Sequence, residues 1–143
     1  MELALNKPDR SNCEGFFVIL VVDDEPRNRF LLANILKRQG YEVAQASDAL
    51  EASKVFSRLR PDVVITDLRM PEIDGADLAL QIHANWPGTG VILTSGYFTG
   101  KAQKVISAEW ADFIYKPIDQ ELLLAKIPRL QLRLVAQKNS IRP

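Results

Sequence analysis

The sequence predicts an α/β domain built on a five-stranded parallel sheet, and three observations support this fold class. Short apolar runs alternate with longer segments in which apolar residues recur at helical spacing. The apolar runs are nearly continuous, which is typical of parallel strands buried on both faces. Polar residues directly follow several of these runs, at the strand ends where ligand sites of open α/β sheets form. Because crossovers between parallel strands are right-handed, helices are expected on both faces of the sheet.

Five strands and five helices are expected in alternation along the chain. The second strand is more polar than the others and is therefore expected at an edge of the sheet. The expected strands are residues 16–22, 41–46, 63–67, 91–95 and 111–115. The expected helices are residues 26–39, 48–60, 76–85, a weaker one within 96–108, and 119–136.

Capping and helix-breaking residues set the limits of these helices. Pro26 suits the first turn of the first helix, and Gly40 is its stop signal. Asp48 is expected to cap the next helix, with Glu51 three residues later. Pro128 lies inside the last helix and is expected to kink it or to split it at the preceding residue.

Composition indicates a soluble globular protein rather than a membrane or nucleic-acid-binding one. The chain has 143 residues, of which 47% are hydrophobic and 25% charged. Lys plus Arg equals Asp plus Glu at 18 each, so overall charge favours neither nucleic acid nor an anionic membrane. The longest apolar run, 16–22, is too short to span a bilayer. The single Cys13 excludes an internal disulfide framework and is compatible with a reducing compartment, so we predict a cytoplasmic location.

The domain organisation is expected to be simple. Residues 1–15 are polar and aperiodic, and are expected to form a flexible N-terminal leader. One domain then spans 16–136, and 137–143 form a C-terminal tail that is too short for an output module. We therefore expect no direct binding of nucleic acid.

Five polar residues are expected to meet at one edge of the sheet. Asp23 and Asp24 follow the first strand, Asp67 ends the third, Thr94 lies near the end of the fourth, and Lys116 follows the fifth. Three carboxylates brought together would repel one another, and a bound divalent cation would relieve this repulsion. Oxygen-only ligands favour a hard cation such as Mg²⁺. A hydroxyl and an ammonium group suit phosphoryl oxygens, and a carboxylate can become an aspartyl phosphate.

These motifs and their order resemble the receiver domain of two-component response regulators, over roughly residues 16–135. The resemblance implies a flavodoxin-like, doubly wound sheet of order 2-1-3-4-5. It also implies that Asp67 accepts a phosphoryl group from a histidine kinase or a histidine phosphotransfer protein. The motifs that carry the resemblance are Val21-Val22-Asp23-Asp24-Glu25, Asp67-Leu68-Arg69-Met70-Pro71, Leu93-Thr94-Ser95-Gly96-Tyr97 and Tyr115-Lys116-Pro117.

The resemblance also implies a metal site. Asp24 and Asp67 would coordinate Mg²⁺ directly, together with the backbone carbonyl of Arg69. Asp23 would contribute through a bound water. The structural alternative is that Asp23 and Asp24 only cap the following helix.

The remaining roles concern the phosphoryl group and the signal. Lys116 would hold one phosphoryl oxygen, and Thr94 would move inward to bind another. Ser95 matches a position kept small for entry of the phosphoryl group. Phe113 matches an aromatic switch position that would rotate inward and change the surface of the fourth helix, fifth strand and fifth helix. The alternatives are an ordinary strand residue for Thr94, a solvated loop lysine for Lys116 and a core aromatic for Phe113.

Other residues carry smaller expectations. His83 is expected on the surface, as neither a relay histidine nor a metal ligand. Trp110 follows Glu109 where many receivers have a Gly-Ala pair, and is interpreted as a partner contact near the signalling face. Apolar residues within 123–135 exceed what one buried helix face needs, which indicates a homodimer contact or the start of a linker helix.

Three hypotheses for function remain. The first is a stand-alone phospho-acceptor that assists its own phosphorylation and dephosphorylation but is not otherwise an enzyme. The second is a receiver module cut from a longer regulator or hybrid kinase. The third is a small Mg²⁺-dependent aspartyl-phosphate phosphatase, which is disfavoured because such enzymes place a second acid where this chain has Arg69. The cognate kinase and the downstream partner are not specified by the sequence.

Overall fold

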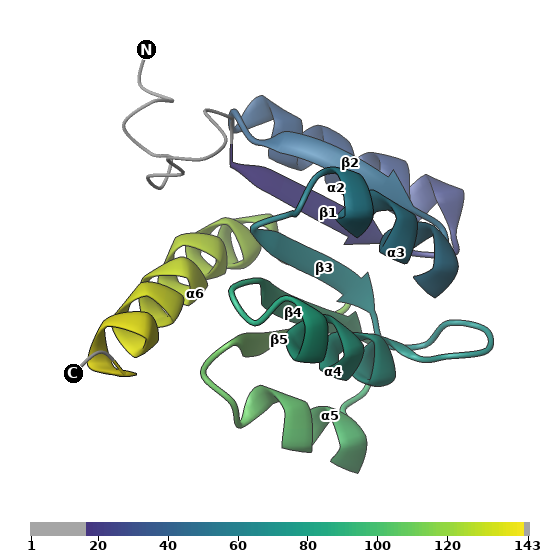
Figure 1. The fold of residues 1–143 in the computed structure, drawn as a ribbon. Helices are drawn as coiled ribbons and strands as arrows, with labels where there is room; N and C mark the ends of the chain where they lie inside the picture. The colour runs from purple at the N-terminus through teal and green to yellow at the C-terminus, as the bar shows by residue number, and fades with distance from the viewer. Residues whose placement is uncertain (1–16, 142–143) are drawn as a thin grey trace.

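The computed structural model describes residues 17–141, and its single sheet has the expected strand order. All four strand pairs are parallel, in the order β2-β1-β3-β4-β5 (Figure 1). This order confirms the flavodoxin-like, doubly wound arrangement, including the edge position of the polar second strand. The strands are β1 (Val18–Val22), β2 (Glu42–Ala46), β3 (Val63–Asp67), β4 (Gly90–Ser95) and β5 (Ala111–Tyr115).

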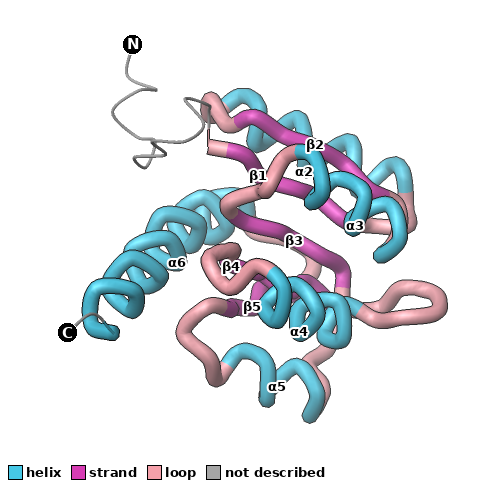
Figure 2. The backbone as a smooth tube through the Cα atoms, viewed as in Figure 1, coloured by secondary structure: helices cyan, strands magenta, loops and turns pink. Residues whose placement is uncertain are grey.

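Five helices alternate with the strands and cover both faces of the sheet (Figure 2). Apolar side chains of α2 and α6 pack on one face, and those of α3, α4 and α5 pack on the other. Within residues 17–141, none of the helices has both the length and the apolar character needed to cross a membrane. The helices are α2 (Pro26–Arg38), α3 (Ala49–Arg58), α4 (Gly75–Asn85), α5 (Gly100–Ile106) and α6 (Gln120–Ile141).

The central strands form the core because both of their faces are covered. Every residue of β1 and β4 is buried, whereas the edge strand β2 has one fully buried residue, Ala46. Burial of large apolar side chains in such a core makes the main favourable contribution to the free energy of folding. The largest fully buried side chains are Ile19, Leu20, Leu36, Phe56, Ile65, Ile82, Ile92, Leu93, Ile114, Leu123, Ile127 and Leu130.

Side-chain caps fix the start of α3, α4 and α5. Asp48 caps α3 by accepting a hydrogen bond from the Glu51 amide at 2.8 Å, which confirms the expected cap. Asp74 caps α4 in the same way. Thr99 caps α5 by accepting from the Ala102 amide at 3.1 Å. The sequence indicated only a weak helix there, and the cap explains why a short helix still forms.

The last helix differs from its expected form. Pro128 does not split α6, because Ile127 and Leu130 on either side of it are both fully buried against the sheet. The helix also continues beyond Ala136 to Ile141, so the expected boundary of the C-terminal tail falls within a helix. The expected leader, 1–15, lies outside the described residues.

A glycine allows α4 to start close to the end of β3. A Cβ atom on Gly75 would collide with the carbonyl oxygen of Asp67 and would lie 2.9 Å from the Cα of Leu68. The Gly75 amide donates a hydrogen bond to the Leu68 carbonyl at 2.7 Å, which holds this close approach in place. The position of Asp67 therefore depends on a residue without a side chain eight positions later.

We expect Gly75→Ala to lower the free energy of unfolding by about 1–3 kcal/mol, because the added methyl group meets rigid backbone. Gly88→Ala is the matched control, since a Cβ atom at Gly88 meets nothing within 4 Å. Urea unfolding of both variants measures the difference. A Gly75→Ala protein as stable as Gly88→Ala would contradict this account of the turn.

Candidate functional site

The predicted polar residues lie together at the carboxyl-terminal edge of the sheet. Asp23 and Asp24 directly follow β1, and Lys116 directly follows β5. Asp67 is the last residue of β3 and pairs in register with Thr94 of β4. Because all the strands are parallel, these positions share one end of the sheet. The expected gathering of the five residues is therefore present in the structure.

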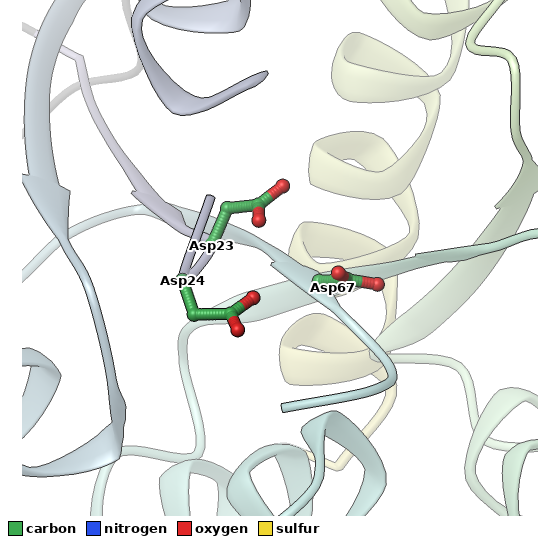
Figure 3. A group of neighbouring side chains, drawn as sticks. All are labelled: Asp23, Asp24 and Asp67. Atoms are coloured by element: carbon green, nitrogen blue, oxygen red, sulfur yellow. The ribbon is translucent and has the colours of Figure 1, made fainter. Parts of the chain in front are cut away.

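Three carboxylates form the centre of this site. Carboxylate oxygens of Asp23, Asp24 and Asp67 lie within 4.8 Å of one another. Figure 3 shows the three side chains gathered where β1 and β3 end. Asp23 is only 6% exposed, Asp67 is half-buried and Asp24 is exposed. The cluster thus extends from the protein interior to the solvent.

Lys116 connects two of the carboxylates. Its Nζ lies 3.2 Å from Oδ2 of Asp67 and 3.8 Å from Oδ2 of Asp23. The lysine side chain is about one quarter exposed, so its charge is only partly screened by solvent. The alternative of a solvated loop lysine does not describe this geometry.

The environment of Asp23 opposes its ionisation. Burial raises the pKa of the Asp23 carboxyl above its ordinary value, and the charges of Asp67 and Asp24 raise it further. The Glu25 amide, which donates to Oδ1 of Asp23 at 2.9 Å, and the ammonium of Lys116 act in the opposite direction without cancelling the effect of burial. An additional cation at this point would favour the ionised form.

The helix-capping alternative for Asp23 and Asp24 is met only in part. The N-cap position of α2 belongs to Glu25, whose side chain makes no capping hydrogen bond. Asp23 does accept from the Glu25 amide, but Asp24 is an exposed member of the carboxylate cluster. A capping role therefore accounts for one oxygen of Asp23 and leaves the convergence of three carboxylates unexplained.

Backbone hydrogen bonds hold the strand ends in fixed positions. The Leu68 amide donates to the Thr94 carbonyl at 2.8 Å, and the Lys116 amide donates to the Ser95 carbonyl at 2.7 Å. Arg29 of α2 donates from Nη1 to the Asp23 carbonyl at 2.8 Å. Arg29 was not predicted at the site, because nothing in its spacing distinguishes it from the other arginines of α2.

Thr94 and Phe113 are both buried, but in different surroundings. Thr94 is buried, and its hydroxyl donates one long hydrogen bond, 3.5 Å, to the Thr66 carbonyl. Phe113 belongs to the core beneath α3, α4 and α5, and its ring makes edge contacts with Phe98 at 4.8 Å and Tyr115 at 5.0 Å. Phe113 is already buried, with an exposed fraction of 9%. The exposed aromatic residue of this strand is Tyr115.

Two residues outside the cluster are less exposed than expected. Trp110 is 6% exposed and packs in the core, so its side chain is not presented to a partner. His83 is half-buried rather than on the surface, and its ring stacks on that of Trp110 with centroids 4.2 Å apart. No local sequence pattern connects these two rings, because they come from α4 and the loop before β5.

The carboxylate cluster fits a divalent cation. The three carboxylates provide negative charge and hard oxygen ligands, which suit Mg²⁺ better than a softer metal. The Arg69 amide lies 3.4 Å from Oδ1 of Asp67, so the backbone of the Arg69 loop closes one side of the cluster. The role of the Arg69 carbonyl as a ligand stays a prediction.

The fold and the site define an α/β domain of the receiver type, and comparison with known proteins agrees. The family model described as the response regulator receiver domain matches residues 19–128. The chain therefore belongs to the response regulator receiver family.

Similar proteins include both single-domain and larger regulators. The chain is 35% identical over 113 residues to the chemotaxis protein CheY of Listeria monocytogenes, covering 78% of this chain and 95% of CheY. It is 34% identical over 125 residues to the regulatory protein AtoC of Escherichia coli, covering 87% of this chain and 27% of AtoC. The crystal structure of the NtrX receiver domain from Brucella abortus superposes with a TM-score of 0.72 at 33% identity, covering 79% of this chain and 97% of that one.

We expect Mg²⁺ to stabilise the protein, because the ion offsets the repulsion among the three carboxylates. A concentration ten times the dissociation constant should add about 1.4 kcal/mol to the free energy of unfolding. In Asp24→Asn the response should be largely lost, whereas Glu109→Gln, which removes a carboxylate outside the cluster, should respond like the parent. Thermal unfolding with and without MgCl₂ measures this, and an unchanged response in Asp24→Asn would place the ion elsewhere.

Proposed function

We propose that this receiver accepts a phosphoryl group on Asp67 from a histidine kinase or a histidine phosphotransfer protein, in a Mg²⁺-dependent two-component relay. The observation that carries the proposal is the bridge from Lys116 to Asp67 at 3.2 Å beside two further carboxylates. One half-buried carboxylate thus contacts an ammonium group and belongs to a cluster suited to a cation. Membership of the receiver family supports the same reaction.

In the proposed transfer, an Asp67 carboxylate oxygen attacks the phosphorus of a phosphohistidine. The new P–O bond forms as the P–N bond breaks, and the departing imidazole nitrogen keeps the electron pair and takes up a proton. Lys116 would bind one phosphoryl oxygen and stabilise its negative charge. When bound, Mg²⁺ would supply further positive charge to the phosphoryl oxygens, held by Asp24 and Asp67 with Asp23 acting through water.

A pocket beside the acceptor offers a place for the donor. It has a volume of about 270 Å³ and is lined by Asp67 and Lys116 together with apolar residues of α2 and the loop after β5. Leu31 of α2 lines this pocket and is 61% exposed. An apolar side chain of the donor protein would fit here while its phosphohistidine reaches Asp67. Apolar contact at this point would give affinity that the charged site alone does not.

The signal would leave through the loop that follows Thr94. A phosphoryl group on Asp67 gives the Thr94 hydroxyl a stronger acceptor than its present 3.5 Å contact. The movement would pass to Phe98, whose ring contacts Phe113 of β5. The affected surface is that of α5, β5 and α6, where Tyr115 is exposed. Phosphorylation shifts this equilibrium only through its different interaction with the two states.

The alternative hypotheses are a module of a longer regulator and a phosphatase, and different observations bear on each. The chain spans nearly all of CheY but about a quarter of AtoC, so both a single-domain regulator and a module of a longer one agree with the comparisons. The phosphatase hypothesis is less favoured, because the family match is to receivers and position 69 holds an arginine instead of an acid. Turnover of a phosphate ester would separate the phosphatase from the receiver.

We expect incubation with acetyl phosphate and Mg²⁺ to add one base-labile phosphoryl group, and Asp67→Asn to remain unmodified. Glu72→Gln serves as the control, since it changes an exposed carboxylate in the same loop. Intact-mass spectrometry measures the addition, and circular dichroism checks that both variants fold. Phosphoryl transfer to Asp67→Asn at the parent's level would move the acceptor to another residue.

We expect Thr94→Ala to accept the phosphoryl group but to lose most of the change at the α5-β5-α6 surface, because no hydroxyl remains to donate a hydrogen bond to the phosphoryl oxygen. Thr94→Ser keeps the hydroxyl and should behave like the parent. Amide exchange across residues 96–115, with and without beryllofluoride as the phosphoryl mimic, measures the change. Equal protection in the parent and in Thr94→Ala would show that the signal takes another route.

A further inference from the structure

One contact joins the two loops on either side of the acceptor. The Cζ atom of Arg69 lies 5.0 Å from the centre of the Tyr97 ring, a cation–π geometry. Arg69 is two residues after Asp67, and Tyr97 is three residues after Thr94. Because Asp67 and Thr94 are paired in register, the two loops leave the sheet side by side. The Arg69–Tyr97 contact therefore joins the two loops where they leave β3 and β4.

Each end of this contact is tied to the site. The Arg69 amide lies 3.4 Å from Oδ1 of Asp67, so the arginine backbone adjoins the acceptor carboxylate. The Tyr97 amide donates to Oγ of Ser95 at 3.3 Å, which holds the tyrosine loop against the end of β4. The ring of Tyr97 is 54% exposed and does not serve the core.

Arg69 differs from the other cations near the acceptor. Lys116 is already within ion-pair distance of Asp67 and Asp23. Lys101 is paired with Asp74 and Asp77, at 3.2 and 3.1 Å. The Arg69 guanidinium has no carboxylate partner among the described residues, and the Tyr97 ring is its contact. It is the cation of these loops that is free to change partners.

We infer that Tyr97 is a positioning residue that holds the Arg69 guanidinium away from Asp67, and that a phosphoryl group on Asp67 competes with the ring for it. This inference rests on the proposed function of Asp67. A phosphoryl group carries close to two negative charges and offers pairs of oxygens that a planar guanidinium can bind in bidentate fashion, more strongly than it binds an exposed aromatic face. Capture of Arg69 releases Tyr97, and with it the loop that leads into α5.

The consequence is a second connection between the acceptor and α5, parallel to that through Thr94. In the unmodified protein, the Tyr97 ring stabilises the state in which the guanidinium is kept from the acceptor. That contact opposes binding of any phosphoryl mimic that recruits Arg69, because the contact must first be broken. Removing the ring should therefore strengthen binding of the mimic, provided that Arg69 is present.

Binding of beryllofluoride in the presence of Mg²⁺ tests this. We expect Tyr97→Ala to bind beryllofluoride about two- to five-fold more tightly than the parent, the range that an exposed cation–π contact supports. Tyr97→Phe keeps the ring and should match the parent. In an Arg69→Gln background, Tyr97→Ala should have no effect. Equal affinity in Tyr97→Ala and the parent, or an equal gain in both backgrounds, would overturn the inference.

A measurement without any phosphoryl mimic tests the contact itself. The δ-protons of Arg69 should show an upfield ring-current shift by NMR in the parent and in Tyr97→Phe, and should lose it in Tyr97→Ala. Absence of the shift in the parent would overturn the inference whatever the binding results. If the parent binds no beryllofluoride and takes no phosphoryl group, the proposed function itself fails, whereas a binding parent with an indifferent Tyr97→Ala overturns this inference alone.

Discussion

The structure of the site depends on the balance of charge at the carboxyl-terminal edge of the sheet. Asp23, Asp24 and Asp67 bring carboxylate oxygens within 4.8 Å of one another, and Lys116 is within ion-pair distance of two of these residues. Such crowding would disperse on a flexible loop, because like charges repel. It persists here because parallel strands deliver the residues to one edge, and because Gly75 lets α4 begin against the backbone of Asp67. An incoming cation or phosphoryl group thus meets a site that is already assembled.

Much of this arrangement could be predicted from sequence, because its signals are local. The apolar runs that precede Asp23 and Asp67 are long enough to identify buried strands, and strand direction then brings their ends together. The cap at Asp48 was equally readable, since the capping residue and Glu51 are three positions apart. The order of the strands, by contrast, came from resemblance to a family and not from periodicity.

The features that escaped prediction depend on contacts between distant segments. The stack of His83 on Trp110 joins α4 to the loop before β5, and neither residue has a local pattern that reveals the other. Pro128 was expected to kink or split the last helix, but α6 is not split there, and the residues around Pro128 are buried against the sheet. The Arg69–Tyr97 contact is of the same kind, because only the pairing of β3 with β4 brings the two loops side by side. Tertiary packing outweighed local propensity at each of these positions.

The central claim is that Asp67, which contacts the Lys116 ammonium beside two further carboxylates, is the phosphoryl acceptor, and that its acidic neighbours are not. The most direct test is to locate the modification chemically. After phosphorylation with acetyl phosphate and Mg²⁺, borohydride reduction converts an acyl phosphate on aspartate to homoserine, and peptide mass spectrometry identifies its position. The account predicts homoserine at position 67 alone. Homoserine at position 23 or 24, with position 67 unchanged, would contradict it.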